Sequence, residues 1–217
     1  VRVKYNLLNS IDIKSFIGKS RTYLEYSDGI IRGIDFETNL FELLALENST
    51  NLILGSSFVS RFQKDNNPKF NLPQNVGIYG LRSNLISGNF NYYLEYVHKY
   101  NDPAGSIADN SNNYASGNAI KTSLTYFQKG LGFSFDAHRV DNMEFRSERQ
   151  QSKEYIINYI PTLSKQHSYT LLAFYPCATQ SNGEIGFQSD LYYKFDRGTT
   201  FGGKYGTKIN INYSRVL

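Results

Sequence analysis

The sequence of 217 residues predicts an all-β protein whose antiparallel strands follow one another as hairpins, and three observations lead to this prediction. Aromatic residues make up 15% of the chain, with 18 Tyr and 15 Phe, and such side chains favour strands. Apolar and polar residues alternate with a period of two over segments longer than a typical soluble strand of about five or six residues. Asn, Ser and Gly, which favour turns, separate these segments.

This alternation locates the individual strands, and it is clearest near the C-terminus. In residues 183–195 most apolar side chains stand at odd positions and most polar side chains at even positions. Residues 41–50 are expected to form a short helical turn or an irregular loop. The candidate segments, which together predict about twelve strands, are residues 1–7, 11–18, 21–27, 30–40, 51–62, 75–85, 86–99, 120–126, 131–138, 153–160, 167–175, 183–195 and 199–213.

The connections between the predicted strands are of two kinds. Tight turns are expected at Ser87-Gly88, Lys129-Gly130 and Asp196-Arg197-Gly198, and long polar loops at residues 100–115, 141–152 and 176–183. Short turns at one end and long loops at the other are typical of membrane β-barrels. The sequence therefore predicts one domain, residues 1–217, that forms an antiparallel up-and-down transmembrane β-barrel or part of a larger one. The loops at residues 101–118, 141–152 and 176–183 are expected on the extracellular side.

Composition and charge exclude several other classes. No apolar run approaches the roughly 18 residues of a membrane helix. The formal charge is +4 without any block of like charges, so a nucleic-acid partner is not expected. Cys177 is the single cysteine, so an intrachain disulfide is excluded. A soluble β-sandwich or β-solenoid stays open as the alternative fold, although strands in those folds are usually shorter.

Alternation in the last strands also predicts which side chains meet lipid, because membrane barrels are apolar outside and polar inside. The lipid-facing side chains are expected to be Ile185, Phe187, Leu191, Tyr193, Phe201, Tyr205, Ile209 and Ile211. The interior-facing side chains are expected to be Gln188, Asp190, Lys194, Lys204, Lys208 and Asn210.

Candidates for catalysis or metal binding are few. His98, His138 and His167 stand on different predicted strands, so they form no local metal motif, and neither a metal nor a cofactor is expected. Asp136 and His138 share a strand face and are the one candidate general-base pair. No nucleophile is identifiable beside them, and a polar pair in the barrel interior explains them equally well.

Two segments resemble a known family. Residues 158–216, which begin NYIPTLSKQHSY, and residues 16–37, FIGKSRTYLEYSDGIIRGIDFE, resemble an uncharacterised family of Bacteroidota outer-membrane β-barrel proteins. The resemblance implies a location in the bacterial outer membrane and brings no assigned activity, cofactor or catalytic residue. Members of the family are longer, so this chain is expected to be a fragment of such a barrel.

These observations together predict a non-enzymatic outer-membrane β-barrel. It is expected to act as a porin-like channel or as a structural component of an envelope, secretion or transport complex. Its expected partners are outer-membrane lipid and other envelope proteins. Two alternatives remain: an outer-membrane barrel enzyme with an active site at its rim, and a soluble β-rich binding protein.

Overall fold

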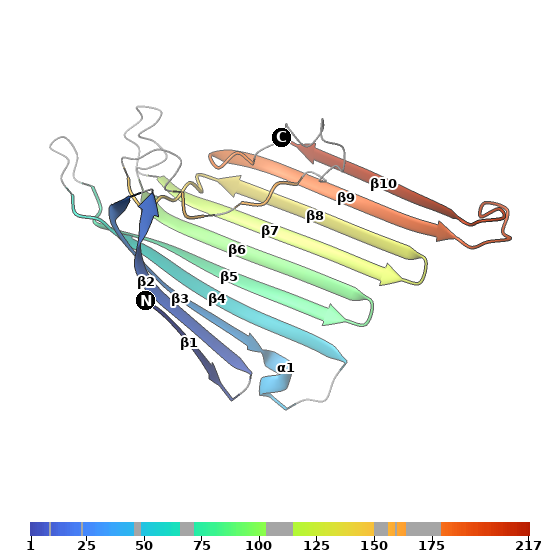
Figure 1. The fold of residues 1–217 in the computed structure, drawn as a ribbon, viewed down its shortest axis with the longest axis horizontal. Helices are drawn as coiled ribbons and strands as arrows, with labels where there is room; N and C mark the ends of the chain where they lie inside the picture. Colours follow the sequence, from blue (N-terminus) through green and yellow to red (C-terminus); the bar gives the residue numbers. More distant parts are fainter. Residues whose placement is uncertain are drawn as a thin grey trace.

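The described residues fold into one antiparallel sheet of ten strands, whose spatial order is the order of the sequence (Figure 1). A computed structural model describes residues 1–8, 10–22, 24–45, 49–65, 72–102, 115–149, 156–158, 160–163 and 179–217. The predicted all-β, antiparallel, up-and-down architecture is confirmed. One four-residue helix, Leu40–Leu43, occurs among the described residues, and it overlaps the start of residues 41–50, for which a helical turn or loop is expected.

The strands are long, and most of them exceed ten residues. Their bounds are β1 Arg2–Leu7, β2 Ile11–Thr22, β3 Glu25–Asn39, β4 Thr50–Phe62, β5 Asn75–Ser87, β6 Phe90–Asp102, β7 Ala115–Gln128, β8 Leu131–Asp141, β9 Gly183–Phe195 and β10 Thr207–Val216, with helix α1 Leu40–Leu43 between β3 and β4. The predicted strand at residues 183–195 coincides with β9.

Two tight hairpins set the register in the middle of the sheet. Ser87 pairs with Phe90 around Gly88, whose φ is 55°. A second turn joins β7 to β8 at Gly130, whose φ is 82°. Glycine adopts such positive φ values without the penalty that a Cβ brings, and positive φ matches the twist of two-residue hairpins. We call the end of the sheet with these turns the tight-turn end, and the opposite end, where β6–β7 and β8–β9 connect, the long-loop end.

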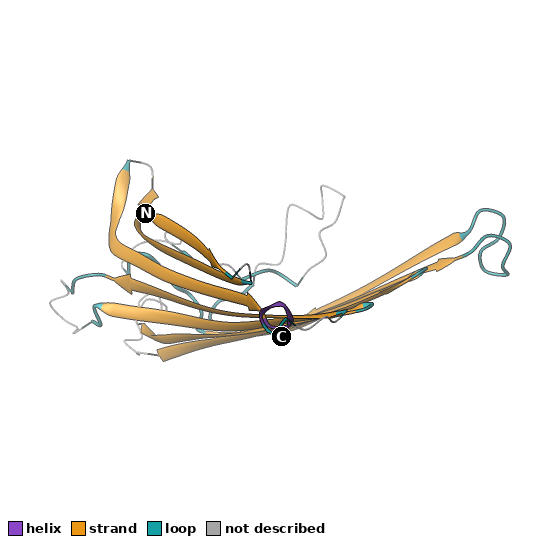
Figure 2. Cartoon of the chain, turned by 90° about the horizontal axis from the view of Figure 1, so that it is seen from below, coloured by secondary structure: helices purple, strands orange, loops and turns teal. Residues whose placement is uncertain are grey.

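The sheet is curved and open. Figure 2 shows the first strands rising out of the plane of the others on one side. In the described part of the chain, β1 and β10 each pair with one neighbour and lie at opposite edges of the sheet. The predicted closure into a barrel is therefore not confirmed.

The strand count departs from the predicted number of about twelve, first near the N-terminus. The predicted strand at residues 21–27 is divided between the end of β2 and the start of β3, because Thr22 pairs with Glu25 across a hairpin. A shift in register between Lys19 and Arg21 bends β2 just before this hairpin. Such bulges are common near the ends of strands.

The predicted strands between β8 and β9 are the second departure. Of residues 153–160, those described form no strand, and Ile156 makes only an isolated bridge with Arg146. Residues 167–175 lie outside the described part of the chain. This long connection thus contributes no described strand to the sheet.

The predicted strand at residues 199–213 is correct only from Thr207 onward. Residues 196–206 form a loop that is closed by backbone hydrogen bonds, among them Gly198 N to Gly203 O at 2.8 Å. Gly198, Gly203 and Gly206 all have positive φ, so glycine conformation overrides the alternating pattern here. Phe201, Lys204 and Tyr205 therefore lie in a loop and not on strand faces.

Candidate functional site

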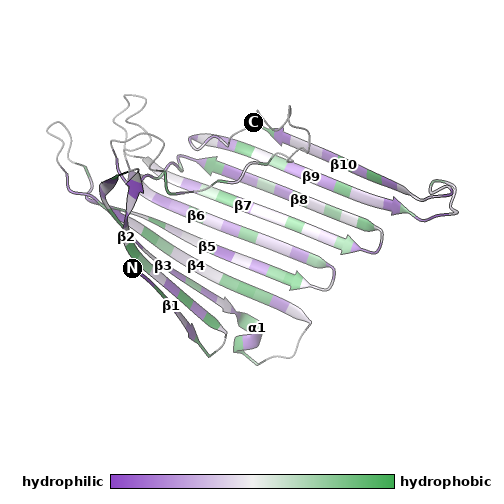
Figure 3. Ribbon diagram, viewed as in Figure 1, coloured by the Kyte–Doolittle hydropathy of each residue, from purple (hydrophilic) through white to green (hydrophobic). Residues whose placement is uncertain are grey.

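The two faces of the sheet differ sharply in chemistry, and the register assigns each residue to a face because paired residues point to the same side. Figure 3 shows hydrophobic and hydrophilic residues following one another along the strands. One row of partners, running from β1 to β7, is Tyr5, Ile13, Phe36, Ser56, Leu81, Tyr96 and Ile120. A second row, running from β6 to β10, is Phe90, Tyr126, Phe133, Leu191 and Ile211. We call this side the apolar face.

The apolar face is exposed over the whole width of the sheet. Ile34, Leu81 and Ile211 are 52%, 54% and 56% exposed, although they lie on β3, β5 and β10. Soluble monomers rarely expose continuous apolar patches beyond a few hundred Å². Strand pairing places six charged residues on this face, and all of them lie near the long-loop end. They are Lys19, Arg21, Arg32, Arg139, Asp141 and Arg215.

Aromatic rings gather on the apolar face at both ends of the strands. At the long-loop end, Tyr79 lies 6.5 Å from Tyr96 and 6.0 Å from Tyr100, measured between ring centroids. At the tight-turn end, Phe90 and Tyr126 are paired with centroids 4.6 Å apart. Aromatic pairs thus lie on the apolar face near both ends of the strands.

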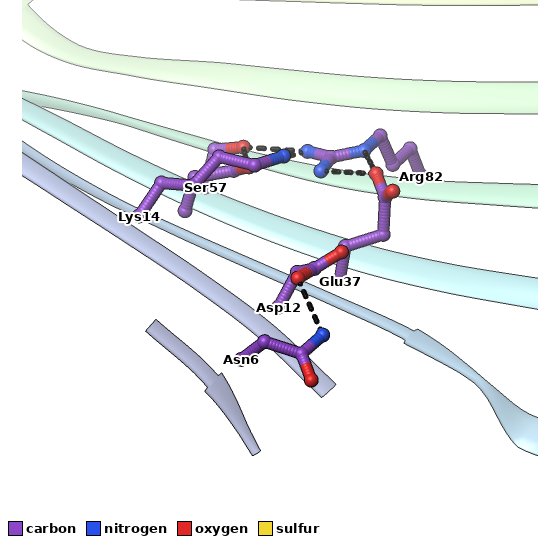
Figure 4. A network of polar contacts seen from close by, with 7 residues as sticks. Asn6, Asp12, Lys14, Glu37, Ser57 and Arg82 are labelled. Atoms are coloured by element: carbon purple, nitrogen blue, oxygen red, sulfur yellow. Dashed lines mark hydrogen bonds and ion pairs between the residues drawn. The ribbon is translucent and has the colours of Figure 1, made fainter. Parts of the chain in front are cut away.

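The opposite side, which we call the polar face, carries charges of both signs. One network joins β2 to β5 (Figure 4). Arg82 forms ion pairs with Asp35 and with Glu37, each at 2.8 Å, and Ser57 donates a hydrogen bond to Asp35 at 2.6 Å. Gly55 leaves room for Arg82, since a Cβ added there would stand 2.5 Å from its side chain. The network gives this part of the face a set of paired, half-exposed charges.

The connection between β8 and β9 folds back over the polar face at the long-loop end, as the trace crossing in front of the strands in Figure 1 shows. We call its described residues 142–149, 156–158 and 160–163 the inward segment. Three side chains from the sheet donate hydrogen bonds to its backbone: Lys99 to Glu144 O at 2.8 Å, Arg61 to Arg146 O at 2.9 Å and Ser27 to Ser147 O at 3.2 Å. These donors lie on β6, β4 and β3, so the segment crosses from β8 to β3.

The inward segment is held close to the sheet by its own side chains. Asn158 donates a hydrogen bond to Met143 O at 2.6 Å and accepts one from Phe145 N at 2.9 Å, which joins its outgoing and returning parts. Phe145 and Met143 are 1% and 4% exposed. Leu163 of the same segment is also buried, as are Val76, Arg61 and Lys99 of the sheet, so the most buried part of the described molecule lies in and beneath this segment.

A fully buried ion pair lies under the inward segment. Arg61 and Asp102 are 2.8 Å apart, and both side chains are completely buried. The guanidinium carbon of Arg61 also stands 5.5 Å from the centre of the Phe145 ring. A buried charge is tolerated only when it is paired and hydrogen-bonded, so this pair fixes where the segment lies.

The predicted Asp136–His138 pair has a different arrangement from the expected one. Both residues lie on the polar face of β8, but the hydrogen bond of His138 goes to Glu184 at 2.7 Å. Glu184 accepts a second hydrogen bond from Gln180 N at 2.8 Å. Sequence reasoning missed Glu184 because it is 46 residues away, and only the β8–β9 register brings the two together.

The residues predicted to face lipid or the interior divide between the two faces. The apolar face holds Ile185, Phe187, Leu191, Tyr193, Ile209 and Ile211, and the polar face holds Gln188, Asp190, Lys194, Lys208 and Asn210. Their contact with lipid or with a barrel interior stays a prediction.

Two features are absent from the described residues, a cluster of metal ligands and a membrane-spanning helix. No group of three or more His, Cys, Asp and Glu side chains is arranged there to hold a metal ion. Among the same residues, no helix is long and apolar enough to cross a membrane.

Comparison with known proteins identifies the family of the chain. Neither the curated proteins nor the solved structures give a match. A family described as "Family of unknown function (DUF6029)" matches residues 1–217. The expectation of a family without assigned function is confirmed, while its placement in Bacteroidota and in the outer membrane stays a prediction. Because the match covers the whole sequence, the chain belongs to the DUF6029 family of unknown function.

Proposed function

We propose that this chain forms the wall of a bacterial outer-membrane β-barrel, with the apolar face against lipid and the polar face lining the interior. The observation that carries the proposal is the apolar face, which exposes large apolar side chains on every described strand except β8 and carries charged residues there only near one end. Lipid acyl chains suit such a surface, whereas water does not, because exposed apolar area is unfavourable in water.

Strand length and aromatic placement support the same proposal. β4, β5, β6 and β9 have 13 residues each, and roughly 9–11 tilted residues cross a bilayer. Rings at both ends of the apolar face fit the two interfacial girdles of a membrane barrel. The long-loop end would then be extracellular and the tight-turn end periplasmic.

A soluble β-sandwich would need a second layer over the apolar face. In the described part of the chain the one segment that folds back over the sheet, the inward segment, covers the polar face instead. This arrangement favours the membrane alternative over the soluble binding protein.

The open edges of the sheet fit a barrel only if further strands pair with them. Unpaired backbone N–H and C=O groups are too costly in the hydrocarbon core for an edge to remain exposed there. On this proposal β1 and β10 pair with strands outside this sheet, so that the closed barrel is larger than ten strands.

The activity proposed for this wall is non-enzymatic, as a porin-like channel lined by the charges of the polar face. The second candidate is a structural component of an envelope complex. The inward segment favours this second role, because it occupies the polar face at the long-loop end and narrows the space that a channel would need.

The proposal is tested on the full protein extracted from membranes. A membrane barrel should require detergent to stay monodisperse, and a protein that remains monodisperse in plain buffer would contradict it. Purified protein in a planar lipid bilayer should conduct ions if it is a channel. Absence of conductance, together with co-purification of other envelope proteins, would favour the structural role.

A further inference from the structure

Two grooves lie on the apolar face near the long-loop end, and each has an arginine at its border. The first, of about 710 Å³, is lined by Ile34, Phe58, Gly77 and Tyr100, with Arg32 beside them. The second, of about 520 Å³, lies between β7, β8 and β9. Its lining includes Ile120, Phe135, Ala137, Ile185 and Phe187, with Arg139 beside them. Four strands separate the two arginines, which stand on β3 and β8.

The first groove exists because β5 carries glycine at its floor. A Cβ at Gly77 would stand 2.9 Å from the ring of Phe58 and 3.3 Å from the ring of Tyr100. Any larger residue there would fill the space between the two aromatic walls. The result is an open groove of about 710 Å³ whose walls include the rings of Phe58 and Tyr100.

The guanidinium of Arg32 is held in place at the edge of this groove. Its Nη2 donates a hydrogen bond to Asn75 Oδ1 at 2.8 Å, and its guanidinium carbon stands 6.0 Å from the centre of the Phe62 ring. Asn75 and Phe62 are themselves paired at the ends of β5 and β4. Arg32 is thus held near the long-loop end, where the charged residues of this face are mostly basic, and its side chain is exposed.

We propose that these grooves bind membrane lipids with anionic, phosphate-bearing headgroups, the acyl chain lying in the groove and the phosphate on Arg32 or Arg139. Guanidinium groups bind phosphate with two parallel hydrogen bonds, which gives arginine its preference for such headgroups. The inference rests on the proposed function, since it places the apolar face in a bilayer. It adds the chemical class of lipid and the residues that select it.

The chain has no tryptophan, so a single introduced one reports on the first groove alone. The full protein carrying Tyr100→Trp is reconstituted into vesicles that contain either brominated phosphatidylglycerol or brominated phosphatidylcholine. Both lipids quench tryptophan by contact and carry the same chains, but only phosphatidylglycerol has a net negative charge. Quenching by phosphatidylglycerol should be stronger, with a relative affinity roughly five-fold higher for one basic residue at the surface.

The matched variants separate the groove from general surface charge. Arg32→Gln in the Tyr100→Trp background should remove the preference for phosphatidylglycerol. Arg197→Gln removes the same charge from the β9–β10 loop at the opposite end, so it should leave the preference unchanged. At the second groove, Phe187→Trp is the reporter, and its preference for phosphatidylglycerol is compared with and without Arg139→Gln. Phe58→Trp is a second reporter for the first groove.

The outcomes distinguish this inference from the proposed function. Quenching that is equal for the two lipids, or that keeps its preference in Arg32→Gln, overturns the lipid site and leaves the membrane barrel standing. Absence of quenching by either lipid at both grooves overturns the proposed function itself.

Discussion

Arg61 and Arg82 lie on the same face of the sheet and hold their carboxylate partners at the same 2.8 Å, yet their surroundings are opposite. Arg61 and Asp102 are completely buried beneath the inward segment. Arg82 and Asp35 lie in the open part of the polar face, with side chains 21% and 28% exposed. The difference arises from a segment that returns from β8 to β3, and not from the strands that carry the two arginines.

The contrast implies that similar ion pairs contribute very differently to stability. Where water reaches a pair, removing one partner lets the other be hydrated, so the cost is small. Where water is excluded, the remaining charge is left without compensation.

Asp102→Ala should be the most damaging change on the polar face. It leaves the buried guanidinium of Arg61 without its carboxylate, which should lower the free energy of unfolding by roughly 3–5 kcal/mol. Asp35→Ala is the matched control and should cost about 1 kcal/mol or less, because Arg82 keeps Glu37 and solvent. Chemical unfolding of both variants in detergent measures the two costs, and similar values would contradict the contrast.

Leu191→Arg and Asp190→Arg compare the two faces at neighbouring positions of β9. Arginine on the apolar face should raise the free energy of the inserted state by up to roughly 2–4 kcal/mol, the largest value applying at mid-bilayer, whereas arginine on the polar face can remain hydrated. Leu191→Arg should therefore reduce the folded, membrane-inserted fraction far more than Asp190→Arg does. Heat-modified mobility of the extracted protein on gels reports this fraction. Equal tolerance at both positions would show that the faces are assigned wrongly.

Gly29→Ala should displace the inward segment without changing any charged residue. A Cβ at Gly29 would stand 1.8 Å from the carbonyl oxygen of Ser147, so the segment or β3 must move, which typically costs about 1–3 kcal/mol. Gly18→Ala on β2 is the control, because a Cβ there has open space around it. Limited proteolysis within residues 142–163 should be faster in Gly29→Ala and unchanged in Gly18→Ala.

The parts of the fold that the sequence predicted correctly are those that depend on alternation and turn residues within a short segment. The period-two alternation of residues 183–195 corresponds to β9, and the glycine of Lys129-Gly130 forms the expected hairpin. Both depend only on neighbours in sequence. In residues 199–206 the same alternation failed, since Gly198, Gly203 and Gly206 have positive φ and belong to the loop at residues 196–206.

The candidate site depends on contacts that no local pattern contains. The inward segment is positioned by Ser27, Arg61 and Lys99, which are 120, 85 and 45 residues from the backbone groups they bind. His138 likewise finds Glu184 through the β8–β9 register. Alternation predicted which residues share a face, but it had no information about which part of a face would be covered.

The smallest expected effect concerns Lys14, which completes the open network around Asp35. Its Nζ stands 3.5 Å from Asp35 Oδ2, and its side chain is 36% exposed. Such a pair contributes roughly 0.2–1 kcal/mol and is weakened by salt. Lys14→Gln should therefore lower the free energy of unfolding slightly at low salt and leave it unchanged at high salt.

Asp102→Ala should respond differently to salt if the inward segment decides how strongly charges on this face interact. Its loss in free energy of unfolding should then be nearly as large at high salt as at low salt. A salt dependence that is equal for the two variants would mean that solvent ions reach Arg61 as freely as Lys14, against its complete burial.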